Sequence, residues 1–134
     1  MTSFPRTLSC AVLLALLAAC MAPIGPAPAD AERVLVYFDE FSANLSPEAK
    51  QAIAKAAASA RAGNARMVRI EARASATGSP LANQYLAQTR SQVVADELTT
   101  DGIPSSMLRQ LPIGQTGSGD PTVAERRVDV VIER

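Results

Sequence analysis

The side chains that most often carry chemistry are scarce in this chain. Its 134 residues include no histidine and only two cysteines, Cys10 and Cys20. The chain therefore lacks the residues for an imidazole base, a Cys/His zinc site or a disulfide framework. The 13 basic and 13 acidic residues give a formal net charge of zero, so the overall charge does not favour nucleic acid or an anionic membrane surface as the main partner. Most familiar catalytic sites are excluded, and no cofactor or metal is expected.

Two remaining patterns could support catalysis or phosphate binding, and neither has the context it needs. Acidic residues suited to glycan hydrolysis occur at Asp39, Glu40, Asp129 and Glu133, but nothing in their spacing brings two of them together. The glycine-rich run at 114–119, G-Q-T-G-S-G, is similar to a phosphate-binding loop, yet no lysine follows it. It also joins two expected strands, whereas a phosphate loop needs a strand, the loop and a helix N-terminus in sequence. The chain is therefore not expected to be an enzyme.

The chemistry marked most clearly in the sequence is lipid attachment at Cys20. An apolar run from Cys10 to Ala19 follows Arg6 and has the length of a secretory signal core, which is too short to span a bilayer. The run ends in Leu17-Ala18-Ala19-Cys20, which resembles the lipobox of bacterial lipoproteins, where diacylglycerol alkylates the cysteine thiol. We therefore predict a lipoprotein signal peptide over residues 1–19. The alternative is an ordinary signal peptide with a chance cysteine.

A proline-rich segment separates Cys20 from the expected domain. Residues 20–32 contain three prolines, which block helix and sheet, so the lipidated cysteine is expected to be followed by an extended tether. Such a tether reaches at most about 35 Å. In the enterobacterial sorting rule that this sequence resembles, an aspartate directly after the lipidated cysteine retains a lipoprotein in the inner membrane. Here that position is Met21. We therefore expect attachment to the outer membrane, with a domain over residues 33–134 facing the periplasm.

The rest of the chain alternates strand and helix patterns in the order βαβαββ. Short apolar or alternating runs predict the strands, and Ser-Pro pairs predict the helix starts, because serine caps a helix and proline suits its first position. The expected strands are Val34–Phe38, Met67–Arg73, Leu108–Ile113 and Arg127–Glu133, and the expected helices run from Ser46-Pro47 to Ala62 and from Ser79-Pro80 to Asp101-Gly102. Both helices can cover only one face of the sheet without tangling the short connections. The expected fold class is α/β, a two-layer sandwich with two helices on one face of a mixed four-stranded sheet.

Markers along these elements resemble the OmpA-like C-terminal domain of outer-membrane proteins and peptidoglycan-associated lipoproteins. The resemblance runs from Val36 to Arg134. In chain order the markers are Tyr37-Phe38-Asp39 with Phe41, Ser42 and Leu45, then Ser46-Pro47-Glu48-Ala49, Ile70-Glu71, Thr77-Gly78-Ser79, Asn83, Leu86 and Arg90, Asp101-Gly102-Ile103-Pro104, and Arg126-Arg127-Val128-Asp129-Val130-Val131. No single marker is decisive, but together they identify the domain as similar to this family.

The resemblance implies a ligand and a site. In that family the domain binds peptidoglycan non-covalently through the diaminopimelate side chain of the stem peptide: an aspartate holds the ammonium and an arginine holds the carboxylate. By spacing, the arginine maps to Arg90 and the aspartate to Ser75. The glycine and threonine that precede the aspartate in the family map to Ala72 and Ala74.

The serine at position 75 is the main departure from the family. It offers one hydroxyl where the family has a full negative charge, and loss of such an ion pair with a ligand costs about 100-fold or more in affinity. Glu125 or Glu71 could act as a substitute anion, but Glu71 should point to the solvent face and Glu125 most simply balances the arginines that follow it. Arg90 itself could hold a ligand or simply snorkel at the rim of the core.

The predicted peptidoglycan-binding residues are Arg90, Ser75, Asn83 and Arg127, although arginines at the start of an exposed strand are often only solvated. Two functions stay open. The first is an outer-membrane lipoprotein that tethers the membrane to peptidoglycan, weakly or atypically. The second is a degenerate OmpA-like domain that acts as a scaffold for a protein partner in an envelope or secretion assembly. No nucleic-acid partner is expected.

Overall fold

The computed structural model describes residues 31–75, 77–115 and 125–134. Its elements are, in order, β1 (Glu32–Tyr37), α1 (Pro47–Ala62), β2 (Met67–Ala74), α2 (Pro80–Thr100), a short 3-10 helix η1 (Ser105–Met107), β3 (Leu108–Gln115) and β4 (Arg127–Glu133). The predicted order βαβαββ is confirmed. The predicted signal peptide, Cys20, most of the tether and most of the glycine-rich run lie outside the described residues.

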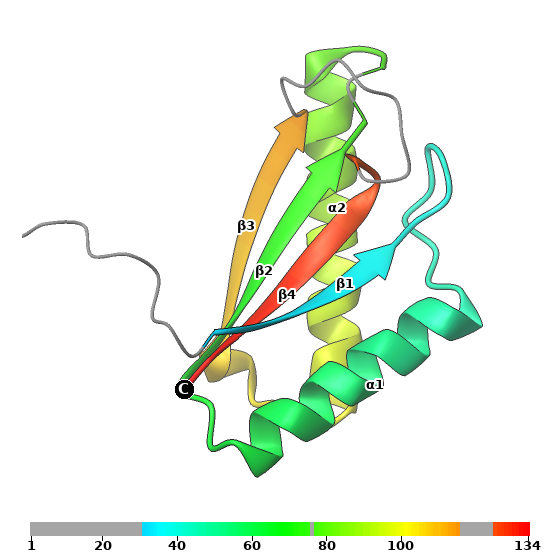
Figure 1. The fold of residues 1–134 in the computed structure, drawn as a ribbon. Helices are drawn as coiled ribbons and strands as arrows, with labels where there is room; N and C mark the ends of the chain where they lie inside the picture. The colour runs from blue at the N-terminus through cyan, green and yellow to red at the C-terminus, as the bar shows by residue number, and fades with distance from the viewer. Residues whose placement is uncertain (1–30, 76, 116–124) are drawn as a thin grey trace, which may run out of the picture.

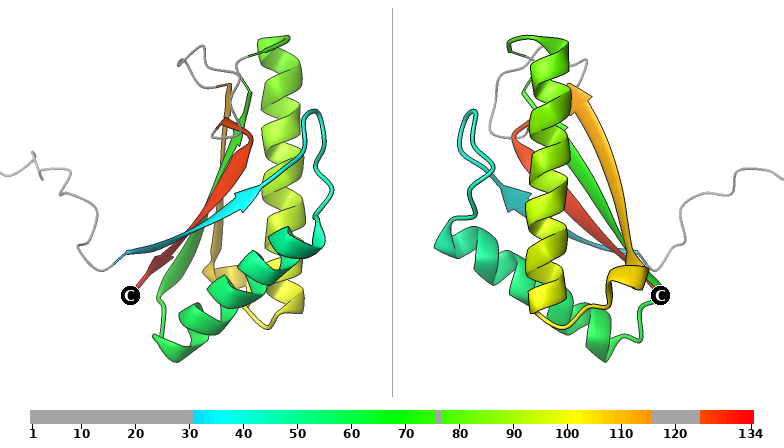
Figure 2. Two further views of the ribbon diagram at one scale, coloured as in Figure 1. Left: turned by 45° about the vertical axis from the view of Figure 1, so that its right-hand side comes forward. Right: turned by 180° about the vertical axis from the view of Figure 1, so that it is seen from behind.

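The four strands form one mixed sheet in the order β1-β4-β2-β3. β4 pairs antiparallel with both β1 and β2, whereas β2 and β3 are parallel. Figure 1 views the sheet from its uncovered side, with α2 behind it, and the two views of Figure 2 show that both helices lie on the same side. The predicted two-layer sandwich is therefore confirmed. We call the uncovered side of the sheet the open face.

The two Ser-Pro pairs begin the helices as predicted, but they do so differently. Ser46 caps α1, because its Oγ accepts a hydrogen bond from the backbone N–H of Ala49 at 3.1 Å. Ser79 precedes α2 without any such side-chain bond, so at this helix start only Pro80 acts as the sequence pattern predicted. α2 ends where Gly102 adopts a φ of 94°, a left-handed conformation that favours glycine.

The core lies between the sheet and the helices. In β2, Val68, Ile70 and Ala72 are fully buried against the helix layer, as the alternating pattern predicted. From α1 the core receives Ile53 and several alanines, and from β4 it receives alternate residues, which are Val128, Val130 and Ile132. Within the part of the chain that the structure describes, no helix combines the length and apolar character needed to cross a membrane.

Candidate functional site

Arg90 is held in the interior by backbone oxygens from two segments. Its side chain is fully buried, with 0% exposed. Nε donates a hydrogen bond to the carbonyl oxygen of Ser42 at 2.8 Å, and Nη2 donates to that of Asp39 at 2.9 Å. Nη1 donates to the carbonyl oxygen of Arg73 at 3.1 Å. Arg90 therefore ties the segment after β1 and the carboxyl end of β2 to helix α2.

The charge of Arg90 has no acidic partner among residues 31–75, 77–115 and 125–134. Its guanidinium carbon lies 5.0 Å from the centroid of the Phe38 ring, which favours a cation. Burial first, and the charge of Arg126 second, lower the pKa of Arg90 to about 10. The side chain therefore stays charged at neutral pH. A guanidinium has five N–H groups, so the three bonds to carbonyl oxygens leave two for an anion.

Ser75 and Asn83 are joined through Thr77, where the chain passes from β2 to the start of α2. Ser75 Oγ lies 2.6 Å from Thr77 Oγ1 and accepts a hydrogen bond from the backbone N–H of Thr77 at 3.3 Å. Asn83 Nδ2 donates to the carbonyl oxygen of Thr77 at 2.9 Å. Ser75 and Asn83 are both buried. Their polar atoms fix the turn between β2 and α2, and they present no negative charge to a ligand ammonium.

Arg126 and Arg127, which stand at the start of the last strand, lie in different surroundings. Arg127 donates from Nε to Asp129 Oδ1 at 2.7 Å on the open face, so it does not join Arg90 behind the sheet. The neighbouring Arg126 acts on Arg90 electrostatically, and its Nε is buried without a hydrogen-bond partner. Of the predicted site residues, Ser75 and Asn83 therefore lie at the start of α2 and Arg90 at its middle, and Arg126, not Arg127, is the arginine that acts on Arg90.

The segment that holds Arg90 carries an exposed aromatic residue that the sequence interpretation did not assign to the site. Phe41 lies between the two residues whose carbonyl oxygens bind Arg90, and it is 70% exposed. Its φ of 55° is uncommon for a residue with a bulky side chain. No sequence signal marks this conformation, since it depends on the bonds that fold the segment over Arg90.

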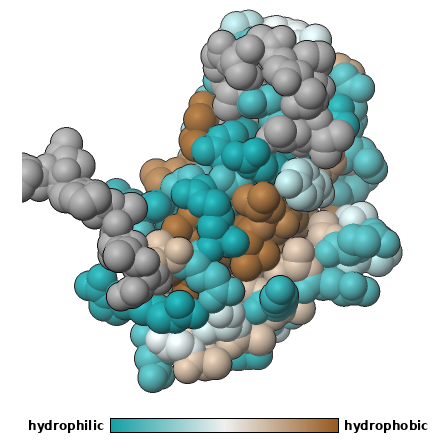
Figure 3. All heavy atoms as spheres, in the orientation of Figure 1, coloured by the Kyte–Doolittle hydropathy of each residue, from teal (hydrophilic) through white to brown (hydrophobic). Residues whose placement is uncertain are grey.

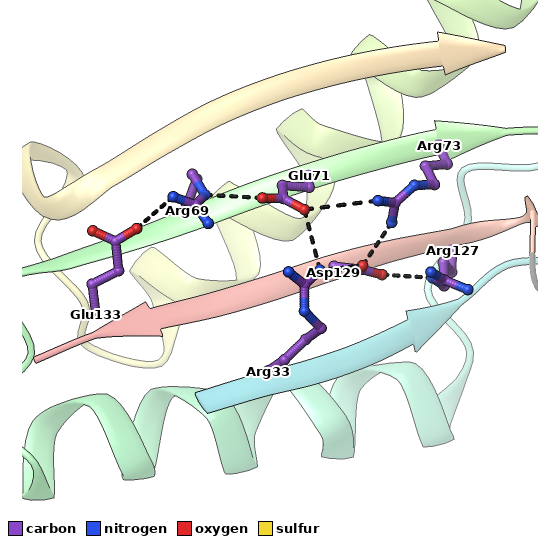
Figure 4. Close-up of polar contacts among 7 residues, drawn as sticks. All are labelled: Arg33, Arg69, Glu71, Arg73, Arg127, Asp129 and Glu133. Atoms are coloured by element: carbon purple, nitrogen blue, oxygen red, sulfur yellow. Dashed lines mark hydrogen bonds and ion pairs between the residues drawn. The ribbon is translucent and has the colours of Figure 1, made fainter. Parts of the chain in front are cut away.

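A second charged cluster occupies the open face, around Asp129 (Figure 4). Asp129 Oδ2 accepts from Arg33 Nη1 at 2.5 Å and from Arg73 Nη1 at 2.6 Å, in addition to the Arg127 bond to Oδ1. The Asp129 side chain is 0% exposed although no helix covers this face. Burial alone raises the pKa of Asp129, but the hydrogen bonds and charges of the three arginines outweigh it and lower that pKa below its ordinary value.

Glu71 and Glu133 extend this cluster along β2 and β4. Arg69 donates from Nε to Glu71 Oε1 at 2.9 Å and from Nη1 to Glu133 Oε1 at 2.6 Å. Glu71 thus points away from the helix layer, as expected, and does not replace the missing family aspartate. The sequence interpretation treated these residues as solvated. The alternation in β2 places Arg69, Glu71 and Arg73 on one face, but the pairing of that face with β4 is seen only in the structure.

Two surface hollows occur, and neither is lined by Arg90, Ser75 or Asn83. One of about 240 Å³ lies at the end of α1 and is lined by residues that include Arg61, Ile103 and Met107. The other, of about 410 Å³, is bordered by Leu45, Val93 and neighbours on α2. No group of three or more acidic, histidine or cysteine side chains arranged for a metal ion occurs in the described part of the chain. The arrangement around Arg90 is suited to bind an anionic group.

The fold and this site place the chain in a known family. A model of the OmpA family matches residues 37–129, so the chain belongs to the OmpA family. The family predicted from the sequence markers is confirmed. No curated protein matches the chain.

Solved structures share the fold at low sequence identity. The peptidoglycan-associated lipoprotein from Burkholderia pseudomallei is 21% identical, with a TM-score of 0.67 over 75% of this chain and 90% of that chain. The OmpA-like domain of FopA1 from Francisella tularensis is 22% identical, with a TM-score of 0.64 over 75% of this chain and 71% of that chain. The periplasmic domain of Helicobacter pylori MotB (residues 97–256) is 14% identical, with a TM-score of 0.58 over 77% of this chain and 78% of that chain.

Proposed function

We propose that this chain is an outer-membrane lipoprotein whose OmpA domain binds peptidoglycan non-covalently in the periplasm and so tethers the membrane to the cell wall. The role is one of binding, without catalysis. The observation that carries the proposal is Arg90, a buried and charged side chain with no acidic partner in the described segments, at the position that the family resemblance assigns to the ligand carboxylate. The similarity in fold to a peptidoglycan-associated lipoprotein supports it.

The proposed ligand is the diaminopimelate side chain of the stem peptide. Its carboxylate would take the two N–H groups of Arg90 that the backbone carbonyls leave over. Because Arg90 is 0% exposed, the ligand has to displace part of the segment around Phe41 to reach it. Its ammonium would meet only the neutral Ser75 hydroxyl. Both features favour weak binding.

The proposed membrane attachment is a lipid at Cys20, followed by the tether over residues 21–31 that leads into β1. Two or three acyl chains are enough for stable anchoring, since each buried methylene contributes about 0.8 kcal/mol. The sequence at 17–20 supports this attachment, and Met21 supports the outer membrane.

A scaffold function is the second candidate, and one observation favours it. The hydroxyls of Ser75 and Thr77 lie in hydrogen-bond contact with each other, and Arg90 is bonded to three carbonyl oxygens. The site is therefore stable without a ligand. A degenerate domain that binds a protein partner in an envelope or secretion assembly would have these properties.

The test is cosedimentation of residues 21–134 with insoluble peptidoglycan sacculi, comparing the wild-type sequence, Ser75→Asp and Ser106→Asp. Ser75→Asp supplies a carboxylate for the ligand ammonium and should raise affinity about ten- to a hundredfold, which corresponds to roughly 1.5 to 3 kcal/mol. Ser106 is an exposed serine of η1 at the other end of α2, so Ser106→Asp is the matched control and should change nothing.

A third variant links the gain to the arginine. Arg90→Lys in the Ser75→Asp chain keeps the charge and loses the planar fork, so it should remove most of the gain, provided that a thermal melt shows the variant folded. If neither the wild-type chain nor Ser75→Asp binds sacculi, the tether proposal is wrong and the scaffold function is favoured.

A further inference from the structure

The open face carries more basic than acidic side chains, although the chain as a whole is neutral. Pairing across the sheet puts on this face the arginines at positions 33, 69, 73, 109 and 127 and the acids at positions 71, 129 and 133. Figure 3 views this face and shows hydrophilic residues beside a hydrophobic patch. The excess of positive charge is therefore a property of one side of the sheet and cannot be seen in the overall charge.

The basic residues of this face are all arginines, and four of them, at positions 33, 69, 73 and 127, are held by ion pairs with acids. Arg33 donates from the same nitrogen to Glu71 and Asp129, yet its side chain is 46% exposed. Its other N–H groups make no ion pair with the described residues. A guanidinium that is already oriented by a carboxylate loses little freedom when it binds a second anion, and its fork geometry suits phosphate.

Arg109 is the most available of these charges. It lies on β3 next to Arg69 in the parallel pair, is exposed, and makes no ion pair or side-chain hydrogen bond with the described residues. Apolar and aromatic side chains flank the charged rows, with Leu35 37% exposed, Tyr37 46% and Leu111 36%. A sheet face with arginines on all four strands, and with exposed tyrosine and leucine on its two edge strands, fits a surface of phosphate headgroups over acyl chains.

We propose that the open face docks on anionic phospholipid headgroups of the membrane that carries the lipid anchor. The proposal rests on the anchored form of the proposed function. Residues 21–31 separate Cys20 from Glu32, the first residue of the edge strand β1, and span at most about 35 Å. A domain on so short a tether keeps this face within reach of headgroups. A second copy of this chain is a poor partner, because it would bring a net positive face against another.

The test uses residues 21–134, which contain every described helix and strand and lack the signal peptide and the acylated cysteine. The probe is a vesicle of equal parts phosphatidylglycerol and phosphatidylcholine, with pure phosphatidylcholine as the reference, in a cosedimentation assay. We expect retention only on the anionic vesicles, and loss of that retention between about 0.1 M and about 0.5 M NaCl.

Variants at Arg109 assign the retention to the open face. Arg109→Gln should lower the partition coefficient about fivefold, whereas Arg109→Lys should keep it, because headgroup attraction depends mainly on charge. Lys55→Gln removes the same charge from the exposed side of α1 and should have less than about a twofold effect. Arg109 has no contact to lose, so these variants should melt like the wild type.

Equal retention on both kinds of vesicle, or equal losses from Arg109→Gln and Lys55→Gln, would overturn the proposal. Retention on immobilised polyglutamate but not on anionic vesicles would also overturn it, and would assign the face to an acidic protein. Sacculus binding of the wild-type chain is measured in parallel. Normal sacculus binding without vesicle binding refutes only the membrane docking, and the reverse result refutes only peptidoglycan binding.

Discussion

Replacing Asp129 by asparagine removes the fully buried carboxylate of the open face, which pairs with Arg33, Arg73 and Arg127. Asp129 is 0% exposed, whereas Arg33, Arg73 and Arg127 are 46%, 20% and 27% exposed. Removing one partner from a fully buried ion pair costs about 3 to 5 kcal/mol. Water screens these partly exposed arginines, so the lower end applies and the expected loss is about 3 kcal/mol.

A thermal melt of residues 21–134 followed by circular dichroism measures this loss. In a domain of about 100 residues, 1 kcal/mol corresponds to a change in Tm of about 4 to 8 °C, so Asp129→Asn should lower Tm by about 15 °C. The matched control is Asp96→Asn on the exposed side of α2, where the carboxylate accepts one hydrogen bond from Gln92. It should change stability by no more than about 0.5 kcal/mol.

The reasoning fails if Asp129→Asn melts within about 2 °C of the wild type while the control behaves as expected. The arginines would then be stabilised by water as well as by Asp129, and the cluster would contribute nothing to the fold. A large loss in both variants would instead indicate a general effect of removing negative charge from this protein.

Three further predictions concern pH, the core and the anchor. The pKa of Asp129 is lowered in the folded state, so its contribution to stability is complete above its unfolded pKa of about 4 and is lost as pH falls through the lower folded pKa. Thermal melts in acid should show this loss of stability, and Asp129→Asn should lose less stability over the same pH range. Ile70→Asp places an unpaired carboxylate at a position with 0% exposure and should abolish cooperative unfolding, whereas Leu81→Asp, at a position 64% exposed, should melt almost normally. Equal effects of the two variants in thermal melts would contradict the assignment of the core face. Cys20→Ser should either release the protein from membrane fractions or leave it there with its signal peptide uncleaved, whereas Cys10→Ser, within the predicted signal peptide, should have neither effect. Unchanged detergent extraction of Cys20→Ser would refute the lipid anchor.

The fold could be predicted from the sequence because its signals are local. The alternation in β2 and the Ser46-Pro47 cap each depend on residues a few positions apart, and each gave the correct element. The end of β3 was less predictable. The strand continues to Gln115 because residues after Pro112 pair with β2 across a register shift between Ala72 and Arg73. The extra residue is Ile113 of β3, which lies between Pro112 and Gly114, so the proline and the glycine were signals of a bulge that the sequence interpretation took for the end of the strand.

The charged cluster on the open face was missed for a related reason. The alternating pattern shows that Arg69, Glu71 and Arg73 share a face, but it does not show which strand lies beside them. Only the order β1-β4-β2-β3 brings Asp129 between Arg33 and Arg73. Buried acids on an uncovered face therefore depend on strand order, which local patterns do not encode.

The role of Arg90 was left open by the sequence. The structure contradicts the interpretation that Arg90 snorkels at the rim of the core, because its side chain is 0% exposed. Its three bonds are to backbone carbonyl oxygens, and every residue has such an oxygen, so no residue type marks the contacts. Loss of binding in an Arg90→Ala variant would therefore prove little, because the same change leaves buried carbonyl oxygens without donors and opens the segment around Phe41. A gain of binding in Ser75→Asp is more informative, since damage to the fold does not raise affinity for a ligand. Position 75, to which the resemblance assigns the aspartate of the family, therefore tests the proposed site more directly than Arg90.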